Sequence, residues 1–369
     1  MESAWSRSST FRIIGTTPLY SAMRVTAAKT SKLHRALDRG AARSVGDAMV
    51  KKWFMVVILM SLIACDSTSI SIQDETITFS QADQQFSIVP FYLTMPTYVE
   101  KARENGTQIN RLYRRYVYGP IWDDFASKGE CSFLAKNIEN PITDLDGLDT
   151  EIGMLSSSGA EEIVKEALLK VSKVLPGPNT TVYLQAIDPS YKKAIPSNGR
   201  EILEMGIHAD TYGTGRIFIS IDPTAKNWRS MLPRVVAHEY HHSVWISRNF
   251  ETVHFRLLDC LVLEGRAEGF ADLCYPNIEV PWPELDTEKE QRVWQRMRPV
   301  LHSKDEQLIM RMFVGDEEIP FLSVYSMGHR IVQEFLKNNP DTSLMAWTDM
   351  EPDEILSRSK YEEKLSAVP

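Results

Sequence analysis

The spacing of apolar residues predicts helices at both ends of the chain and short strands between them. Apolar residues recur at helical intervals over 97–118 and again over 158–175. Residues 181–187 and 206–222 instead alternate apolar and polar positions, which is typical of strands, and Gly213-Thr214-Gly215 indicates a hairpin turn. Charged helical segments follow over 286–312 and from Pro320. The mixture predicts an α+β protein with a small antiparallel sheet and a mainly helical C-terminal part.

The borders of these elements carry weaker signals. Ser158-Gly159-Ala160-Glu161 has the spacing of a capping box and predicts a helix start. Residues 66–96 are rich in Ser, Thr and Gln, which suggests a tether that leads into one or two edge strands. Ile88 to Thr94 is a candidate for one such strand, interrupted by Pro90. Residues after Pro340 are expected to form a polar end piece.

The segment Met49–Cys65 has the order of regions found in a secretory signal. Two lysines precede an apolar run of about a dozen residues, which is too short to span a bilayer. The run ends in Leu62-Ile63-Ala64-Cys65, which resembles a bacterial lipobox. This resemblance implies a start at Met49, a signal peptide over 49–64, a lipid on Cys65 and an upstream over-extension of the reading frame over 1–48. A buried helix that ends in a chance cysteine, or a transit peptide, would be the alternatives.

Charge and cysteine content limit the partners that the chain could bind. Of the 41 Lys/Arg and 49 Asp/Glu, ten and three respectively precede residue 66, so the remainder carries a net charge of −15. An acidic surface argues against nucleic acid as a partner. It also leaves membrane attachment to the covalent lipid. Three cysteines would remain, Cys131, Cys260 and Cys274, which implies no framework of disulfides, although a Cys260–Cys274 bridge stays open.

The strongest chemical signal is His238-Glu239-Tyr240-His241-His242, which has the pattern H-E-x-x-H. The preceding residues, 228–236, favour a helix, and positions i and i+4 of a helix share one face. His238 and His242 can therefore hold two corners of a tetrahedral zinc site. Glu239 lies beside the first ligand, where its carboxylate can reach a metal-bound water and act as general base.

A second motif supplies a third ligand. Glu264 and Glu268 lie four residues apart, and enough chain separates them from His242 for a turn and a returning helix. The two motifs together resemble those of gluzincin metallopeptidases, and the fuller string resembles a bacterial family of predicted Zn-dependent proteases over roughly residues 150–345. The resemblance implies a zincin-like fold, zinc bound by His238, His242 and Glu264, and Glu268 as the residue that orients a ligand histidine. The metallopeptidase domain is expected to span 97–369.

Three further residues near these motifs have predicted roles. An amide under attack develops negative charge on its oxygen, which a Tyr or His donor would stabilise. The related family carries a Tyr followed by Gly near the last helix, so Tyr325 is the first candidate and His329, one turn later, the second; a core tyrosine beside a surface histidine is the plain alternative. His241 points away from the ligand face and is expected to pack or hydrogen-bond.

The sequence therefore predicts a zinc peptidase that cleaves a peptide or protein substrate and is lipid-anchored in the bacterial cell envelope, outside the cytoplasm. A strand just before the zinc helix could bind an extended peptide at its exposed edge. The alternative is a lipoprotein that serves as a binding or scaffolding module with a structural or vestigial zinc site. A structural site needs four protein ligands. Cys260 lies on the Glu264 face of the second helix, but is expected to point into the core.

Overall fold

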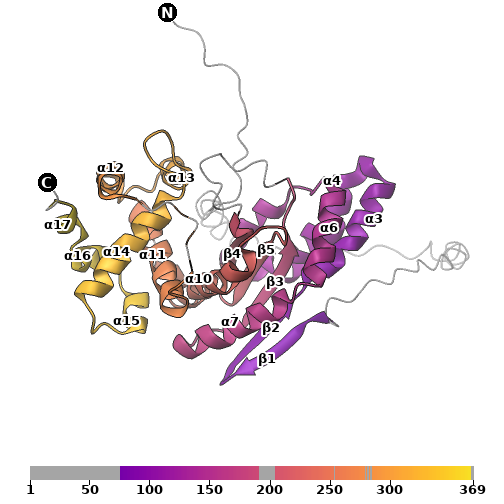
Figure 1. The fold of residues 1–369 in the computed structure, drawn as a ribbon, viewed down its shortest axis with the longest axis horizontal. Coiled ribbons are helices and arrows are strands. Elements are labelled where there is room, and N and C mark those ends of the chain that lie inside the picture. Colours follow the sequence, from indigo (N-terminus) through magenta and orange to yellow (C-terminus); the bar gives the residue numbers. More distant parts are fainter. Residues whose placement is uncertain are drawn as a thin grey trace, which may run out of the picture.

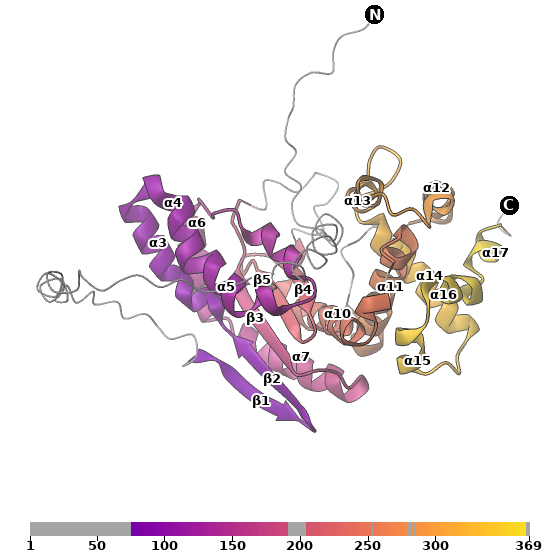
Figure 2. The same cartoon turned by 180° about the vertical axis from the view of Figure 1, so that it is seen from behind.

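A computed structural model describes residues 75–190, 204–252, 254–278, 280, 282 and 285–366. Cys65 and the segments predicted over 1–48 and 49–64 lie outside the described residues. The described chain is α+β: a small sheet with helices beside it, followed by a helical C-terminal part (Figures 1 and 2). No helix in these ranges is long and apolar enough to cross a membrane.

The sheet has five strands in the order β1-β2-β3-β5-β4. The strands are β1 Ile77–Gln81, β2 Gln84–Val89, β3 Thr180–Ala186, β4 Ile207–Gly213 and β5 Arg216–Ile221. The prediction that the sheet is antiparallel is wrong, because β2 pairs parallel with β3, and β3 pairs parallel with β5. The reason is the long helical segment between β2 and β3: it carries the chain back to the end of the sheet from which β2 started, so β3 runs parallel to β2.

The predicted hairpin is confirmed, with one change that matters for the site. β4 pairs antiparallel with β5, and a register shift occurs between Thr211 and Gly213. The strand directly before the zinc-motif helix, β5, lies between β3 and β4. It therefore has no free edge, and the edge beside that helix belongs to β4.

Helices before β3 are shorter than the spacing of apolar residues predicts. The helix expected over 97–118 divides into α3 Met95–Glu104, α4 Ile109–Tyr113 and a π-helical turn Arg114–Tyr118. Asn105 leaves helical geometry at the first break. Pro90 ends β2, since it has no N–H for the ladder, and Phe91–Thr94 form a 3-10 turn instead of a strand.

α5 Gly119–Asp124, α6 Leu145–Ser156 and α7 Ala160–Val174 complete this part of the chain. The predicted capping box is wrong: Gly159, with φ of +72°, occupies the N-cap of α7. The Ser158 hydroxyl accepts a hydrogen bond from the Ala160 N–H instead. α7 packs beside α10 and contacts β1 and β2.

Two long helices carry the two motifs, α10 Trp228–Asn249 and α11 Leu257–Cys274. α10 contacts β4 and α7 as well as α11, so it lies between the sheet and the C-terminal helices (Figure 1). The C-terminal helices are α12 Thr287–Met297, α13 Glu306–Val314, α14 Ser323–Asn338, α15 Leu344–Asp349, α16 Pro352–Ser359 and α17 Tyr361–Ser366. The expectation of a polar end piece after Pro340 is wrong, because Trp347, Ile355 and Tyr361 are buried in the core.

α11 and α14 pack backbone to backbone through two glycines. A Cβ on Gly265 would lie 2.2 Å from the Gly328 carbonyl oxygen, and one on Gly328 would lie 2.0 Å from the Leu261 carbonyl oxygen. Neither position tolerates a side chain without moving a helix. Because Glu264 precedes the first glycine and Tyr325 lies one turn before the second, this close packing sets the distance between those two side chains.

Candidate metal centre

Three predicted ligands converge in the described structure. The Nε2 atoms of His238 and His242 lie 2.9 Å apart, and the Glu264 Oε2 atom lies 3.3 Å and 3.4 Å from them. Ligands about 2.0–2.1 Å from a tetrahedral zinc ion are separated from one another by about 3.3 Å. All three side chains are buried. Two imidazole nitrogens and one carboxylate oxygen at this spacing fit a zinc ion, and no other set of at least three potential ligands comes together in the described residues.

The two helices place these ligands by ordinary helix geometry. His238 and His242 are one turn apart on α10, so both rings project from the same face. Pro233 lies in the second turn of α10, four residues after Arg229. The helix continues through this proline. Glu264 comes from the middle of α11, which packs against α10. The site is therefore assembled from two successive helices.

Glu268 contacts the outer nitrogen of the candidate ligand His238. Its Oε1 atom lies 2.6 Å from the His238 Nδ1 atom, and its Oε2 atom accepts a hydrogen bond of 2.6 Å from the Arg234 guanidinium. Arg234 is 2% exposed and lies one turn before His238 on α10. A histidine paired with a carboxylate in this way has its ring orientation fixed, as is common for histidines that bind a metal.

Arg234 extends this chain of contacts to the surface. Its second terminal nitrogen donates to Asp272 Oδ1 at 2.7 Å, and Asp272 Oδ2 lies 2.6 Å from His329 Nε2. Gln333 donates to the same Asp272 oxygen. The guanidinium also lies 5.1 Å from the centre of the Trp282 ring. His329, a predicted oxyanion donor, thus contacts Asp272 and does not line the cavity around the ligands.

Glu239 lines the same cavity as the three ligands. Its Oε2 atom accepts a hydrogen bond of 2.7 Å from the Thr211 hydroxyl of β4. The strand thereby fixes the position of the carboxylate that the motif predicts as general base. Thr211 has no counterpart in the sequence reasoning, because a single threonine in a strand gives no signal of its own.

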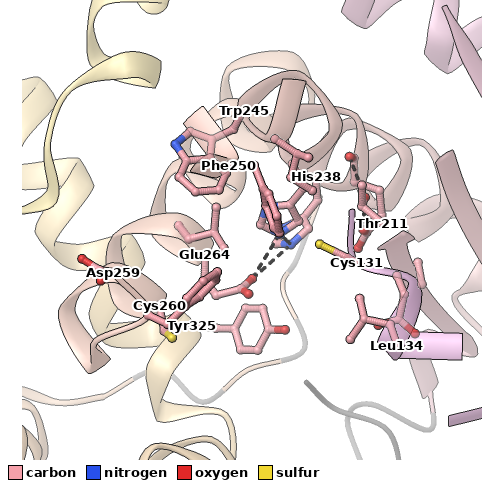
Figure 3. A pocket seen from close by; sticks show the side chains of 17 residues that line it. Cys131, Leu134, Thr211, His238, Trp245, Phe250, Asp259, Cys260, Glu264 and Tyr325 are labelled. Atoms are coloured by element: carbon pink, nitrogen blue, oxygen red, sulfur yellow. Dashed lines mark hydrogen bonds and ion pairs between the residues drawn. The ribbon is translucent and has the colours of Figure 1, made fainter. Parts of the chain in front are cut away.

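Tyr325 also lines the cavity and approaches a ligand (Figure 3). Its ring centre lies 6.1 Å from that of His238, and it stacks on Trp282 at 5.7 Å. Burial, together with the nearby carboxylates of Glu264 and Glu239, raises the pKa of Tyr325 well above its usual value. The phenol therefore keeps its proton at neutral pH.

The cavity leaves about 60 Å³ for the centres of water-sized molecules, and two kinds of side chain line it. Polar groups surround the ligands, whereas apolar side chains form the remaining walls: Leu134, Trp245, Ile246, Phe250, Phe255 and Leu263. Cys131, Leu134 and Thr211 lie on one side, and Asp259, Cys260 and Glu264 on the other (Figure 3). A cleft of this shape accepts a ligand with both apolar and polar parts.

Charges in the site depend on one another. Burial opposes protonation of His238, but Glu268, Glu264 and Glu239 outweigh it and raise its pKa to about 10. Burial opposes ionisation of Glu264, but His242 and His238 outweigh it and lower its pKa to about 2. Glu268 has its pKa lowered in the same way, by His238 and Arg234 against the effect of burial. The pocket is therefore suited to hold positive charge.

His241 takes no part in the ligand group, as predicted. It is fully buried, and its ring stacks on Trp347 and lies tilted against Phe270. Its Nε2 atom lies 3.3 Å from the Thr348 hydroxyl. Burial and the neighbouring His242 lower the pKa of His241. This confirms the prediction of a packing and hydrogen-bonding residue.

The three described cysteines are free thiols. Cys260 and Cys274 lie at opposite ends of α11, about 20 Å apart at 1.5 Å per residue, which excludes the bridge left open by the sequence. Cys260 is buried in the core as expected, and it also lines the cavity. It does not belong to the convergent ligand group.

Sequence reasoning missed four polar residues of the site: Arg234, Asp272, Asp210 and, as noted above, Thr211. A signal existed for the first two, since Arg234 is four residues before His238 and Asp272 four residues after Glu268. Each extends an established face of its helix by one turn. Asp210, on β4, lines the cavity. Burial, with Glu239 and Glu264 nearby, raises its pKa well above its usual value.

Fold and site together define an α+β protein with a candidate zinc centre built on two consecutive helices. The family described as predicted Zn-dependent protease (DUF2268) matches residues 160–357, and the chain belongs to this family. The matched segment contains both motifs and all three candidate ligands. Among curated proteins and among solved structures, no significant match was found.

Proposed function

We propose that the protein hydrolyses peptide bonds with a zinc ion held by His238, His242 and Glu264. The convergence of these three ligand atoms, in a cavity that Glu239 also lines, carries the proposal. A bound zinc ion would polarise a peptide carbonyl and supply a water molecule of lowered pKa. Glu268 would keep the His238 ring in the orientation for binding, through its 2.6 Å contact with Nδ1.

Glu239 would serve as general base. Its carboxylate takes a proton from water and passes it to the nitrogen of the leaving amine. The Thr211 hydroxyl, at 2.7 Å, positions this carboxylate at the cavity wall. The role of donor to the carbonyl oxygen goes to Tyr325, which lines the cavity, in preference to His329, whose ring is bonded to Asp272.

The free edge of β4 would bind the substrate backbone, in place of the β5 edge expected from the sequence. Ala209, Asp210 and Thr211 line the cavity, so an extended peptide that pairs with this edge would pass the ligands. The apolar walls would accept its side chains. A scaffold with a structural zinc site would need a fourth ligand, and the described residues bring together only three.

Replacement of the base separates catalysis from metal binding. The Glu239→Gln variant should bind one zinc ion per chain by elemental analysis and lose peptide hydrolysis by about two orders of magnitude or more. A matched control is Glu251→Gln, which changes an exposed acid beyond the end of the same helix and should leave both properties intact. Full turnover by the Glu239→Gln variant, or a zinc-loaded native protein that cleaves no peptide in a mixed library, would contradict the proposal.

We also propose attachment to the membrane of a bacterial envelope by a lipid on Cys65. The order of charged, apolar and small residues before this cysteine supports it. Cys65→Ser should move the protein from the membrane fraction to the soluble fraction on cell lysis, whereas Cys131→Ser should not. Mass spectrometry of the N-terminal peptide checks the modification, and an unmodified Cys65 within an uncleaved chain would overturn it.

A further inference from the structure

Among the described residues, the outer edge of β4 pairs with no other strand, and this short free edge ends beside the candidate metal centre. The Ile221 carbonyl accepts a hydrogen bond from Ile187, the residue that follows β3, and the Gly206 carbonyl accepts one from Asp222. Backbone groups alternate in direction along a strand, so Ile207, Ala209 and Thr211 direct theirs away from β5. A peptide bound to this edge would pair with these residues.

A preceding segment of the chain closes the edge immediately afterwards. The Cys131 N–H donates to the Tyr212 carbonyl at 2.8 Å, which takes the position that the next residue of a bound peptide would need. The Glu130 carboxylate accepts hydrogen bonds of 2.8 Å from both the backbone N–H and the hydroxyl of Thr214. Gly129 lies so close that a Cβ there would be 2.0 Å from the Tyr212 oxygen. We call residues 129–134 the closing segment.

The metal ligands lie next to this closed end. Thr211, the last residue with a free edge position, contacts the proposed base Glu239 directly. Cys131 and Leu134 of the closing segment line the cavity together with the ligands (Figure 3). A scissile bond at the ligands therefore has several free edge positions on one side, toward Ile207. On the other side the edge allows only a very short piece of chain.

Asp210 supplies an unpaired acceptor oxygen at the closed end. Its side chain is 10% exposed, and its Oδ2 atom has no hydrogen-bond partner among the described residues. The His208 Nδ1 atom is 3.9 Å away, beyond hydrogen-bond distance. Asp210 lines the cavity together with Glu264 and with Cys131 of the closing segment. A buried acceptor oxygen of this kind is open to a hydrogen-bond donor from a ligand.

We propose that the site acts on peptide N-termini, with Asp210 receiving the α-ammonium group and the closing segment preventing further extension of the chain; this rests on the peptidase function proposed above. An ammonium group brings the N–H donors that Asp210 Oδ2 lacks, and its positive charge favours the ionised form of the carboxyl. A peptide antiparallel to β4, the commoner arrangement, directs its N-terminal end toward Tyr212 and the closing segment. Water adds across the scissile amide, so a short N-terminal piece leaves with a new carboxylate and the remaining peptide keeps a new amine.

Blocked and free substrates test the inference on the native protein. A peptide of about ten residues with a free N-terminus should lose one or two residues from that end, as followed by mass spectrometry. The same peptide with an acetylated N-terminus should be cleaved on the order of a hundredfold more slowly, because the charge-assisted bond is lost. Amidation of the C-terminus should change the rate by less than about twofold, since the closed end does not contact it.

A binding measurement tests recognition of the peptide N-terminus without requiring hydrolysis. The zinc-loaded Glu239→Gln variant should bind the free peptide on the order of tenfold or more tightly than its acetylated form, measured by calorimetry. The double variant with Asp210→Asn should lose this preference while retaining zinc. The matched control is Asp222→Asn, which changes another buried acid of the same hairpin that is already bonded to Thr224 and lies outside the cavity lining. It should keep the preference.

The outcomes distinguish the two proposals. Cleavage of free and acetylated peptides at equal rates within their sequences would overturn the N-terminal inference and leave the peptidase function standing. A native protein that cleaves neither peptide would remove the peptidase function, and equal binding of both peptides by the Glu239→Gln variant would remove the recognition by Asp210. If Asp210→Asn does not fold, the comparison of blocked and free peptides still decides the question.

Discussion

Arg234 is the residue that joins most parts of the site. It is buried, yet it forms ion pairs with two carboxylates of α11, one of which contacts the candidate ligand His238. Each carboxylate in turn has a second partner, so no charge in the group is left unpaired. Burial and pairing of this kind are expected to be costly to disturb, because the loss of one partner leaves an uncompensated buried charge.

We expect Arg234→Met to weaken zinc binding on the order of tenfold or more, because Glu268 would no longer be held against His238. The free energy of unfolding should also decrease by about 3–5 kcal/mol. Competition with a chromogenic chelator measures the first effect, and urea denaturation the second. Arg234→Lys keeps the charge but cannot bridge both carboxylates, so its zinc affinity should lie between those of the native protein and the Met variant. An unchanged zinc affinity in the folded Met protein would exclude the positioning role.

The raised pKa of His238 and the lowered pKa of Glu264 predict how the metal-free protein responds to pH. His238 stabilises the fold fully below its unfolded value of about 6.5, and the effect is lost as the pH rises toward 10. Glu264 stabilises it above about 4.5, and the effect is lost as the pH falls toward 2. Chelator-treated protein should therefore be most resistant to urea between about pH 4.5 and 6.5.

The urea midpoint of the metal-free protein, measured from about pH 4 to pH 10, checks this expectation. His238→Gln should remove the decline on the alkaline side while keeping a polar group of similar size in place. A native protein that becomes more stable over the alkaline part of this range without metal would show the opposite sign and contradict the charge assignment.

At the scale of elements, the contact between α11 and α14 decides whether the site is complete. Gly265 and Gly328 let the two helices meet through their backbones. We expect Gly328→Ala to separate them, to destabilise the fold by about 1–3 kcal/mol, and to reduce peptide hydrolysis more than zinc binding. The reason is that Tyr325 belongs to α14, whereas all three ligands belong to α10 and α11.

Thermal unfolding, zinc content and turnover of Gly328→Ala test this expectation together. Gly153→Ala is the matched control, since a Cβ at that exposed helical position meets nothing within 4 Å. It should raise stability by about 0.5–1 kcal/mol through helix propensity. If the two variants had the same melting temperature, zinc content and turnover, the contact between α11 and α14 would not determine the geometry of the site.

Elements also show where sequence reasoning succeeds and fails. Local patterns located the hairpin, α7 and the motif helix, because periodicity and turn residues are properties of adjacent residues. The order of the strands, and therefore the free edge of β4, depends on contacts between residues far apart in the chain. His238, His242 and Glu264 lie in two helical motifs, so their spacing in the sequence predicts a shared site. Asp210 and Thr211 have no such spacing, because only the folded sheet brings them to α10.

At the scale of the whole molecule, a metal ion would link two long helices that both lie in the core. A zinc ion that binds the folded chain and not the unfolded one should stabilise the fold by about 2.7 kcal/mol at roughly one hundred times its dissociation constant. We therefore expect a higher melting temperature with added zinc and a lower one after treatment with a chelator. Calorimetry of the same sample before and after reconstitution measures both.

The control for this expectation is the ligand variant His242→Ala, which should show no shift with zinc. Magnesium should have no effect on the native protein either, because it prefers an octahedral set of oxygen ligands. A melting temperature that zinc leaves unchanged in the native protein, at concentrations that saturate the site by elemental analysis, would exclude coupling between metal and fold.

The placement of all three ligands on two successive helices has a consequence for biosynthesis. Contacts between neighbouring elements form faster than those between distant ones. A nascent chain that has emerged only as far as α11 already carries every group needed to capture the ion, while Tyr325 is still to come. Loading would then precede assembly of a working cleft, so the newly made protein could acquire its metal before it was able to cut its neighbours.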